Sequence, residues 1–261
     1  MDDFRNSLKK LLEQWNRLRP EKNFNHELEF RIGRFSAQNT FVPGIQTDEK
    51  DAITNLRQCL AKEVLSSPNR WIDVPEILAV RSYHAQNIRR TIIRSQKGDE
   101  NKEIIERKIN INQMDIRTDR PLHVRASICK EEHLTYHPNS PEYISFKQNV
   151  SVANAVSVLH RKSFLEKLEH SHYGPVVFRY DITKSAPRAS NKKECANLPC
   201  QYHIELELES VSSPLTESDH IHYVMELIIV RLQFLLGTHQ VSTTPNTPPQ
   251  ALPPATLRIV S

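Results

Sequence analysis

Glutamates recur at every second position in two segments of the chain. HELEFRIGRF, at residues 26–35, carries Glu27 and Glu29, and YHIELELE, at residues 202–209, carries Glu205, Glu207 and Glu209. Successive side chains of a β-strand point to opposite faces, so each set of glutamates shares one face, with neighbours about 6 to 7 Å apart. Rows of like charges destabilise a strand unless water, cations or bases neutralise them. The two rows therefore predict a site for a divalent cation that prefers oxygen ligands, Mg²⁺ or Mn²⁺.

The segments between these two acidic strands carry basic residues on their polar faces. The charged residues at alternating positions are Arg89 in NIRRTII, Lys108 in IIERKININ, Arg125 and Glu131 in HVRASICKE, Arg161 in HRKSF, and Arg179 and Asp181 in VFRYDIT. A guanidinium binds phosphate oxygens as a two-pronged fork, and an ammonium binds them as a point charge. Any one of these strands fits the solvated side of an ordinary antiparallel sheet. Their recurrence predicts instead that the polar faces turn inward and line a charged tunnel.

A mainly β chain is needed to position these residues. Apolar and polar residues alternate from about residue 71 to residue 209, interrupted by turn-rich stretches such as RSQKGDEN. Apolar residues at helical spacing predict three helices, over residues 4–18, 54–65 and 219–236, the last ended by Gly237. We expect a mainly β (α+β) fold: a closed antiparallel β-barrel with a charged interior, whose apolar outer face is covered by the helices. Residues 1–240 would form this tunnel domain, and the proline-rich residues 241–261 a disordered tail.

The composition excludes several classes of protein. Charged residues make up 25% and hydrophobic residues 38% of the 261 residues, with a formal net charge of +4, which fits neither a disordered polyelectrolyte nor a membrane protein. The five glycines form no glycine-rich loop before a helix, which excludes a Walker or dinucleotide-binding loop. The four scattered cysteines are expected to be free thiols. Because the N-terminal segment lacks the long apolar run of a secretory signal, we expect a protein that is not secreted.

The order of the charged strands resembles that of a known enzyme family. ELEFRIG and ELELE are similar to the first and last acidic strands of the metal-dependent RNA 5′-triphosphatases of fungal, protist and viral mRNA capping, which are triphosphate tunnel metalloenzymes. NIRRT, ERKI, RASICKE, HRKSF and FRYDITK resemble the family's intervening strands in the same order, from about residue 24 to residue 210. Two positions depart from the family pattern: Leu159 stands where a lysine is usual, and His203 where a glutamate often begins the last strand.

The resemblance implies a reaction and a role for each candidate residue. The reaction is removal of the γ-phosphate from the 5′-triphosphate end of nascent mRNA, the first step of cap formation. Mg²⁺ or Mn²⁺ would be held by Glu27, Glu29 and one or more of Glu205, Glu207 and Glu209. Phosphate oxygens would be bound by Arg89, Lys108, Arg125, Arg161 and Arg179. Glu131 or another carboxylate outside the metal site would orient the attacking water, and Asp181 would hold an arginine in place.

Other functions stay open at the level of sequence. The same fold could hydrolyse a free nucleoside triphosphate, polyphosphate or thiamine triphosphate, and a noncatalytic RNA-binding β module is an alternative from another class. Zinc is disfavoured, because histidine pairs such as His220 and His222 diverge on a helix, and Cys195 and Cys200 lack a second matched pair.

The resemblance and the composition also bear on partners and location. The expected partner is a 5′-triphosphate RNA end, and the proline-rich tail could tether an mRNA guanylyltransferase. A homodimer is left open, and no membrane association is expected. We expect the nucleus for a cellular protein, or the cytoplasm or virion for a viral one.

Overall fold

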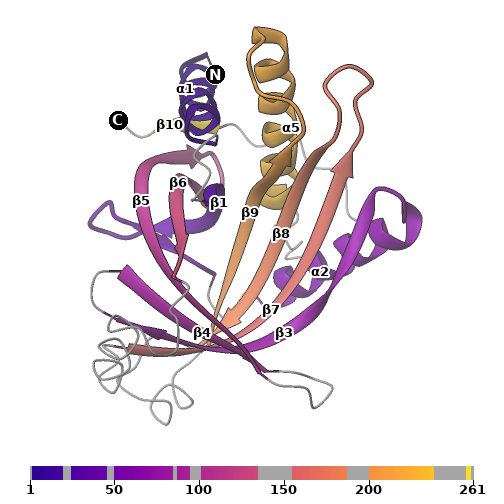
Figure 1. The fold of residues 1–261 in the computed structure, drawn as a ribbon. Helices are drawn as coiled ribbons and strands as arrows, with labels where there is room; N and C mark the ends of the chain where they lie inside the picture. Colours follow the sequence, from indigo (N-terminus) through magenta and orange to yellow (C-terminus); the bar gives the residue numbers. More distant parts are fainter. Residues whose placement is uncertain are drawn as a thin grey trace, which may run out of the picture.

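The protein is a mainly β structure with helices outside a barrel, as predicted (Figure 1). The computed structural model describes residues 2–19, 25–45, 50–84, 87–94, 101–134, 155–186, 200–237 and 257–259. The helices are α1 (Asp2–Leu18), α2 (Lys50–Ser66) and α5 (Ser218–Gly237). The strands are β1 (Asn25–Phe35), β2 (Phe41–Pro43), β3 (Trp71–Tyr83), β4 (Ile88–Arg94), β5 (Lys102–Thr118), β6 (His123–His133), β7 (Ala155–Leu168), β8 (Val176–Ser185), β9 (Gln201–Val211) and β10 (Leu257–Ile259). All three predicted helices are present, and α2 begins earlier than the predicted residue 54.

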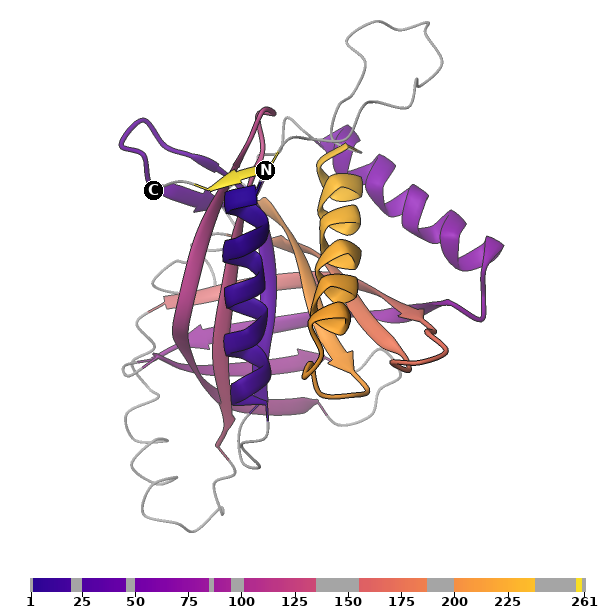
Figure 2. The same ribbon diagram turned by 90° about the horizontal axis from the view of Figure 1, so that it is seen from above.

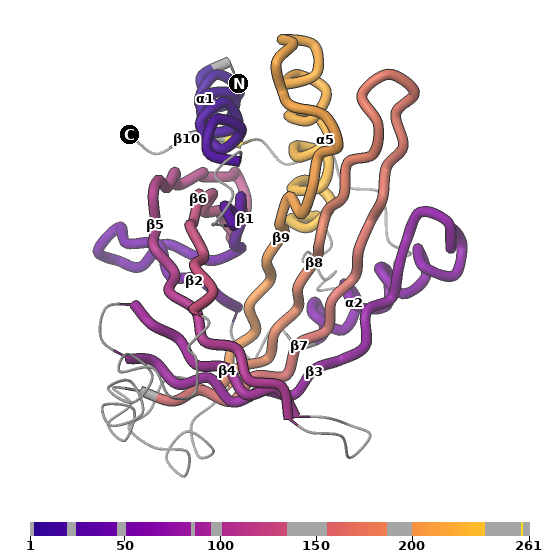
Figure 3. Tube along the Cα trace, viewed as in Figure 1, coloured from indigo at the N-terminus to yellow at the C-terminus, as the bar shows by residue number. Residues whose placement is uncertain are grey.

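Within the described residues, eight antiparallel strands close into a ring. Its order is β5, β4, β3, β7, β8, β9, β1 and β6, and β6 pairs back to β5. Figure 3 shows β3, β7, β8 and β9 side by side along one wall. The short strands β2 and β10 pair with β1 and β5 outside the ring. The predicted closed barrel is therefore confirmed.

The hydrophobic core lies outside this ring. Leu28, Phe30 and Ile32 on β1 are at most 1% exposed, and they belong to the same apolar cluster as Leu12 and Trp15 of α1. Because side chains alternate along a strand, the residues between them on β1, which include the predicted glutamates, turn to the other face, toward the lumen. The polar interior and apolar exterior predicted from the alternation are both present.

Two helices pack side by side over this apolar outer face. Figure 2 shows α1 and α5 next to each other against the barrel, with α2 farther along, beside β3. Helix α5 is long and apolar enough to cross a membrane by length and composition, but 56% of its most apolar window is buried in the protein. Val224, Ile228 and Leu232 on α5 are completely buried in the core. Helix α5 therefore serves as a core helix of this fold.

A buried ion-pair network fixes α5 to the barrel wall. Glu166 of β7 is 1% exposed and accepts hydrogen bonds from Nε and a terminal nitrogen of Arg231 on α5, both at 2.9 Å. Its carboxylate also accepts a hydrogen bond from the Tyr180 hydroxyl at 2.7 Å and one from Nε of Arg70 at 3.0 Å. A terminal nitrogen of Arg70 donates as well, so five donors from three residues satisfy one buried carboxylate, as a charge removed from water requires.

The C-terminal tail differs from its prediction at one point. Leu257–Ile259 form β10, paired antiparallel with β5, and Leu257 is 3% exposed within the core. An apolar residue that pairs with the edge of a sheet and packs into the core buries enough surface to be ordered, even where the preceding sequence is rich in proline. The prediction of a disordered tail is therefore wrong for these three residues, and residues 238–256 and 260–261 lie outside the described residues.

Candidate active site

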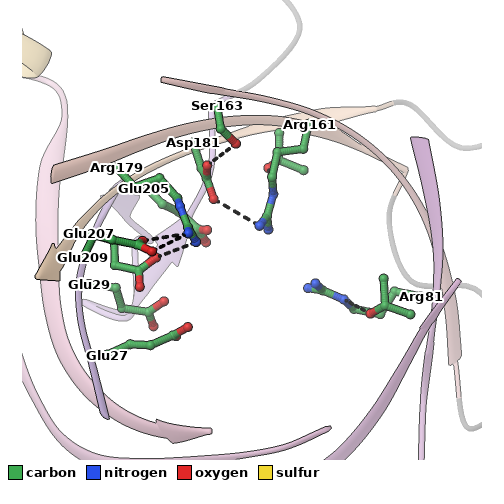
Figure 4. A network of polar contacts seen from close by, with 12 residues as sticks. Glu27, Glu29, Arg81, Arg161, Ser163, Arg179, Asp181, Glu205, Glu207 and Glu209 are labelled. Carbon is green, nitrogen blue, oxygen red and sulfur yellow. Dashed lines mark hydrogen bonds and ion pairs between the residues drawn. The ribbon is translucent and has the colours of Figure 1, made fainter. Parts of the chain in front are cut away.

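The glutamates of β1 and β9 form one acidic wall of the tunnel. The two strands are paired, with Glu29 opposite Glu207 and Arg31 opposite Glu205. Figure 4 shows Glu27, Glu29, Glu205, Glu207 and Glu209 gathered on the same side of the lumen. Strand pairing therefore brings together two glutamate rows that the alternation predicted separately, one for each strand.

Lys108 of β5 faces this wall and binds three carboxylates. Its ammonium lies 2.7 Å from a Glu27 oxygen, 3.0 Å from a Glu29 oxygen and 3.3 Å from a Glu131 oxygen. The Lys108 side chain is only 15% exposed. Burial acts to lower the pKa of Lys108, but the surrounding carboxylates outweigh it and raise the pKa above its ordinary value. Lys108 is therefore a permanently charged member of the site.

Two of the glutamates are held in an environment short of positive charge. Burial raises the pKa of Glu207 to about 9, and the charge of Glu27 acts in the same direction. Burial also raises the pKa of Glu27 to about 7, although Lys108 opposes the shift. Carboxyl groups that are so reluctant to ionise are stabilised by any additional cation brought between them.

Two further glutamates of the site have cations beside them that balance their charge. Burial acts to raise the pKa of Glu205, but Arg31 and Arg161 outweigh it and lower the pKa to about 2. Burial acts likewise on Glu131, whose pKa falls to about 2 because of Lys108 and Arg89. These two carboxylates stay ionised at neutral pH and hold the surrounding arginines and lysine in place.

The last strand distributes its three glutamates among different partners. Glu205 pairs with Nε of Arg31 at 3.0 Å, and Glu209 pairs with Arg179 at 2.7 Å. Glu207 has only a longer contact with Arg179, at 3.4 Å, and it stands opposite Glu29. Of the three, Glu207 is the one placed to share a cation with Glu27 and Glu29.

The donor chemistry of this wall suits a hard divalent cation. Carboxylate oxygens on adjacent strands are the ligands that Mg²⁺ and Mn²⁺ prefer, and the raised pKa values mark a deficit of positive charge there. Among the described residues, no group of three His, Cys, Asp or Glu side chains is close enough together to hold a metal ion in the present side-chain positions. The Lys108 ammonium lies between Glu27 and Glu29 instead. The ligand types fit the cation, while the side chains rest in ion pairs.

Arginines from three other strands face the lumen around this wall. Arg161 of β7 lies 3.0 Å from Asp181 of β8, and Asp181 also accepts a hydrogen bond from Ser163. Nε of Arg161 donates to Thr183 at 3.1 Å. Asp181 thus forms an ion pair with Arg161 on the neighbouring strand.

Arg89 and Arg125 are placed differently from each other. Arg89 of β4 lies 2.7 Å from Glu106 and also pairs with Glu131. Arg125 of β6 forms a two-pronged pair with Asp115, at 2.6 and 2.8 Å, and stacks on the Phe41 ring. Arg89 thus pairs with glutamates of β5 and β6, whereas two nitrogens of the Arg125 guanidinium are occupied by the Asp115 carboxylate.

A cavity of about 830 Å³ occupies the tunnel. Its lining includes six of the predicted site residues, which are Glu29, Arg89, Lys108, Arg125, Arg161 and Glu205. His203, which departs from the family pattern, also lines it, and burial lowers the pKa of His203. Residues from nine strands, the eight of the ring and β2, thus meet around one space although they lie far apart along the chain.

Three charged residues of the tunnel were not among the predicted site residues. Arg31 and Glu106 lie on the same alternating faces as Glu29 and Lys108, so continuing the alternation by one pair would have found them. Arg81 of β3 also lines the cavity. A register shift between Val74 and Ile77 interrupts the alternation in that strand, so its sequence does not show which face Arg81 takes.

The residues behind the zinc alternative have other surroundings. His220 is 2% exposed, and its ring stacks on that of Tyr173 with centroids 4.2 Å apart. Cys129 is a free thiol that donates a hydrogen bond to Glu29, and burial raises its pKa to about 12. Cys59 and Cys200 are also free thiols, and Cys195 lies outside the described residues.

Solved structures share this fold. No protein-family model matches the sequence, and no curated protein matches it. The chain is similar to the RNA triphosphatase Pct1 of S. pombe, with a TM-score of 0.64 and 12% identity over 91% of this chain and 94% of that one. Pct1 in complex with the Spt5 CTD matches with a TM-score of 0.62, 12% identity and coverage of 91% and 95%. The mimivirus capping enzyme triphosphatase matches with a TM-score of 0.48 and 10% identity over 88% of this chain and 97% of that one. The two Pct1 matches show that this chain has the fold of an RNA triphosphatase.

Proposed function

We propose that this protein removes the γ-phosphate from the 5′-triphosphate end of RNA, the first step of mRNA cap formation, in a metal-dependent reaction. The observation that carries the proposal is a closed tunnel in which one wall is acidic and short of positive charge, while arginines and a lysine occupy the rest. The fold shared with Pct1 supports the same reaction. In phosphoryl transfer the protein mainly positions the reactants and neutralises the charge of the phosphate oxygens, and a lining of acidic and basic residues can do both.

Glu27, Glu29 and Glu207 would hold Mg²⁺ or Mn²⁺ at the acidic wall. The ion would neutralise charge on the phosphate oxygens of the substrate. Its binding would also relieve the mutual repulsion that raises the pKa of Glu27 and Glu207. Glu205 and Glu209, bound by Arg31 and Arg179, would keep those arginines in position.

The basic residues would bind the triphosphate. Lys108, Arg89 and Arg161 line the cavity, and each would offer donors to non-bridging oxygens. Arg179, beside Glu207, would do so at the acidic end. Arg125, saturated by Asp115, would support the wall of the tunnel. Enclosure of the phosphates in the tunnel excludes bulk water and strengthens each of these contacts.

Glu131 would orient the attacking water as a hydrogen-bond acceptor. Lys108 and Arg89 outweigh the effect of burial and hold its pKa at about 2, so it stays ionised in the working pH range. Such a carboxylate is a weak base, so its contribution would be orientation of the water more than removal of its proton.

Phosphate release from triphosphate-ended RNA tests the function. The wild-type protein should require Mg²⁺ or Mn²⁺, and Glu27→Ala or Glu207→Ala should lower turnover by about 100-fold or more while the far-ultraviolet circular dichroism is retained. Glu103→Gln is the matched control, because Glu103 pairs with Arg90 away from the cavity. Normal turnover in both alanine variants would contradict the proposal.

Competition between substrates tests the preference for RNA. Free ATP, inorganic polyphosphate and thiamine triphosphate, each offered with triphosphate-ended RNA, should be hydrolysed less efficiently than RNA. A higher kcat/KM for any of them would assign the tunnel to that substrate instead.

The remaining partners and the location follow from the proposed reaction. An mRNA guanylyltransferase would accept the diphosphate end, and copurification with the full chain but not with a chain lacking residues 241–261 would support tethering through the tail. Sedimentation measures whether the protein is a homodimer. Nuclear location in a cellular host, or cytoplasmic or virion location for a viral protein, stays a prediction that immunofluorescence can check.

A further inference from the structure

Arg81 projects its guanidinium into the tunnel. It lies on β3 and lines the cavity, and Figure 4 shows it across the lumen from Glu27 and Glu29. Its Nε donates a hydrogen bond to Thr91 Oγ1 at 3.1 Å, which fixes the direction of the side chain. Among the described residues, Arg81 forms no ion pair with an Asp or Glu oxygen within 4.0 Å. Its terminal nitrogens are therefore donors that face the cavity.

The other arginines and the lysine of the cavity lining are all bound to acids. The pairs are Arg31 with Glu205, Arg89 with Glu106, Lys108 with Glu27, Arg125 with Asp115, and Arg161 with Asp181. A phosphate that approaches any of these cations competes with a carboxylate already in place. Within the described part of the chain, Arg81 is the one lysine or arginine of the lining that forms no ion pair with a carboxylate.

Two further guanidiniums add to the positive charge around Arg81. Burial lowers the pKa of Arg81, and the nearby charges of Arg89 and Arg161 lower it further, while Glu106 acts in the opposite direction. Cations gathered in a partly buried space repel one another unless an anion lies among them. A phosphate beside Arg81 would therefore reduce the repulsion among these three guanidiniums.

We propose that Arg81 is a substrate-binding residue that binds a phosphate group of the triphosphate on the side of the tunnel opposite Glu27 and Glu29. The identity of the substrate rests on the proposed function, whereas the anion site rests on the tunnel itself. The planar guanidinium presents two donors to two phosphate oxygens, a geometry that a lysine does not reproduce. Arg81 would thus hold the phosphate chain across the tunnel from the acidic wall.

Calorimetric titration with inorganic tripolyphosphate, without RNA, tests the anion site directly. Arg81→Gln should weaken binding by about 10- to 100-fold, as expected for loss of a charge-assisted contact, and Arg81→Lys should recover part of the affinity. Arg90→Gln is the matched control, since it removes an equal charge from the neighbouring strand, where Arg90 pairs with Glu103 away from the cavity. Wild-type affinity in Arg81→Gln, an equal loss in Arg90→Gln, or no binding by the wild-type protein would overturn the proposal.

A measurement on the wild-type protein avoids any doubt about folding of the variants. Tripolyphosphate should protect Arg81 from modification by 2,3-butanedione, read by mass spectrometry of the peptide that contains it, and should leave Arg90 unprotected. Equal modification of Arg81 with and without tripolyphosphate would contradict the site.

Steady-state kinetics with triphosphate-ended RNA then separates the two proposals. Arg81→Gln should raise KM more than it lowers kcat, and it should reduce the dependence of KM on salt. Unchanged KM in an active variant would refute the role of Arg81 and leave the proposed function standing. An inactive wild-type protein that still binds tripolyphosphate through Arg81 would refute the proposed function and leave the anion site standing.

Discussion

Replacement of Glu207 by glutamine should stabilise the metal-free protein while it abolishes activity. Burial, together with Glu27, raises the pKa of Glu207 from the ordinary 4.5 to about 9. A carboxyl whose pKa is raised on folding contributes stability that is fully present below pH 4.5 and is lost as the pH rises through 9. At pH 7 the Glu207 carboxyl is ionised in the unfolded chain, about 2.5 pH units above its pKa of 4.5, but stays protonated in the folded chain. Each pH unit is worth about 1.4 kcal/mol, so this difference lowers the free energy of unfolding by about 3 kcal/mol. Glutamine has the same shape and no charge, and it avoids this cost.

Urea unfolding in EDTA at pH 5 and pH 8 measures the effect. Glu207→Gln should be more stable than the wild-type protein at pH 8, by about 5 kcal/mol, since pH 8 lies about 3.5 pH units above 4.5, and the difference should shrink toward pH 5. Added Mg²⁺ or Mn²⁺ should raise the stability of the wild-type protein and leave that of the variant almost unchanged, because a ligand stabilises only a folded state that binds it. Glu103→Gln, on the outer surface, should follow the wild-type protein in both respects.

The reasoning fails if Glu207→Gln is less stable than the wild-type protein at pH 8 in EDTA. That result would mean that the carboxylate is already satisfied by Arg179, at 3.4 Å, and that no positive charge is lacking at the acidic wall. Equal stabilisation of both proteins by Mg²⁺ would place the cation elsewhere.

Three further substitutions test the fold around the site. Glu166→Ala should lower the free energy of unfolding in urea by about 3 to 5 kcal/mol, because it leaves Arg231 buried without its ion pair. Adding Arg231→Met should restore part of this stability. A double variant no more stable than the single one would contradict the reasoning. Burial lowers the pKa of His220 from 6.5, so below this pH the unfolded chain binds a proton that the folded chain does not bind, and the free energy of unfolding should fall as the pH drops through 6.5. His220→Phe should make the free energy of unfolding depend less on pH in this range. An unchanged pH dependence would refute the assignment. Gly33→Ala should lower the melting temperature, because a Cβ there would meet the Val42 carbonyl oxygen at 2.3 Å, whereas Gly237→Ala, with open space, should change it little; equal effects would count against the close approach.

The sequence predicted which side chains face the tunnel because a strand repeats every two residues. Glu27 and Glu29 alternate with Leu28 and Phe30, whose burial in the core shows the two faces directly. The same rule placed Lys108 and Arg161 in the lumen, and the structure finds both in the cavity lining. The roles assigned to these residues stay predictions until the substitutions above are measured.

Pairing between distant strands could not be read from periodicity. Alternation does not say that β9 lies beside β1, and it is this pairing that sets Glu207 opposite Glu29 and leaves Glu205 to Arg31. Arg81 was missed because the register shift at Val74 breaks the repeat before that residue. Leu257 was missed because local composition was dominated by prolines, whereas its place depends on β5, more than 100 residues away.

The apolar cluster outside the ring has a consequence for how this protein could change. On β1, β6, β8 and β9 one set of alternating side chains forms the core, and the proposed chemistry uses the other set, so the two requirements fall on different residues of the same strands. Alternate positions along β3, β4 or β7 could be rewritten to suit polyanions of other lengths or charges while the residues beneath α1 and α5 are left untouched. The lumen-facing residues of these strands are therefore suitable positions for redesign, because the bound polyanion could be changed without changing the hydrophobic core.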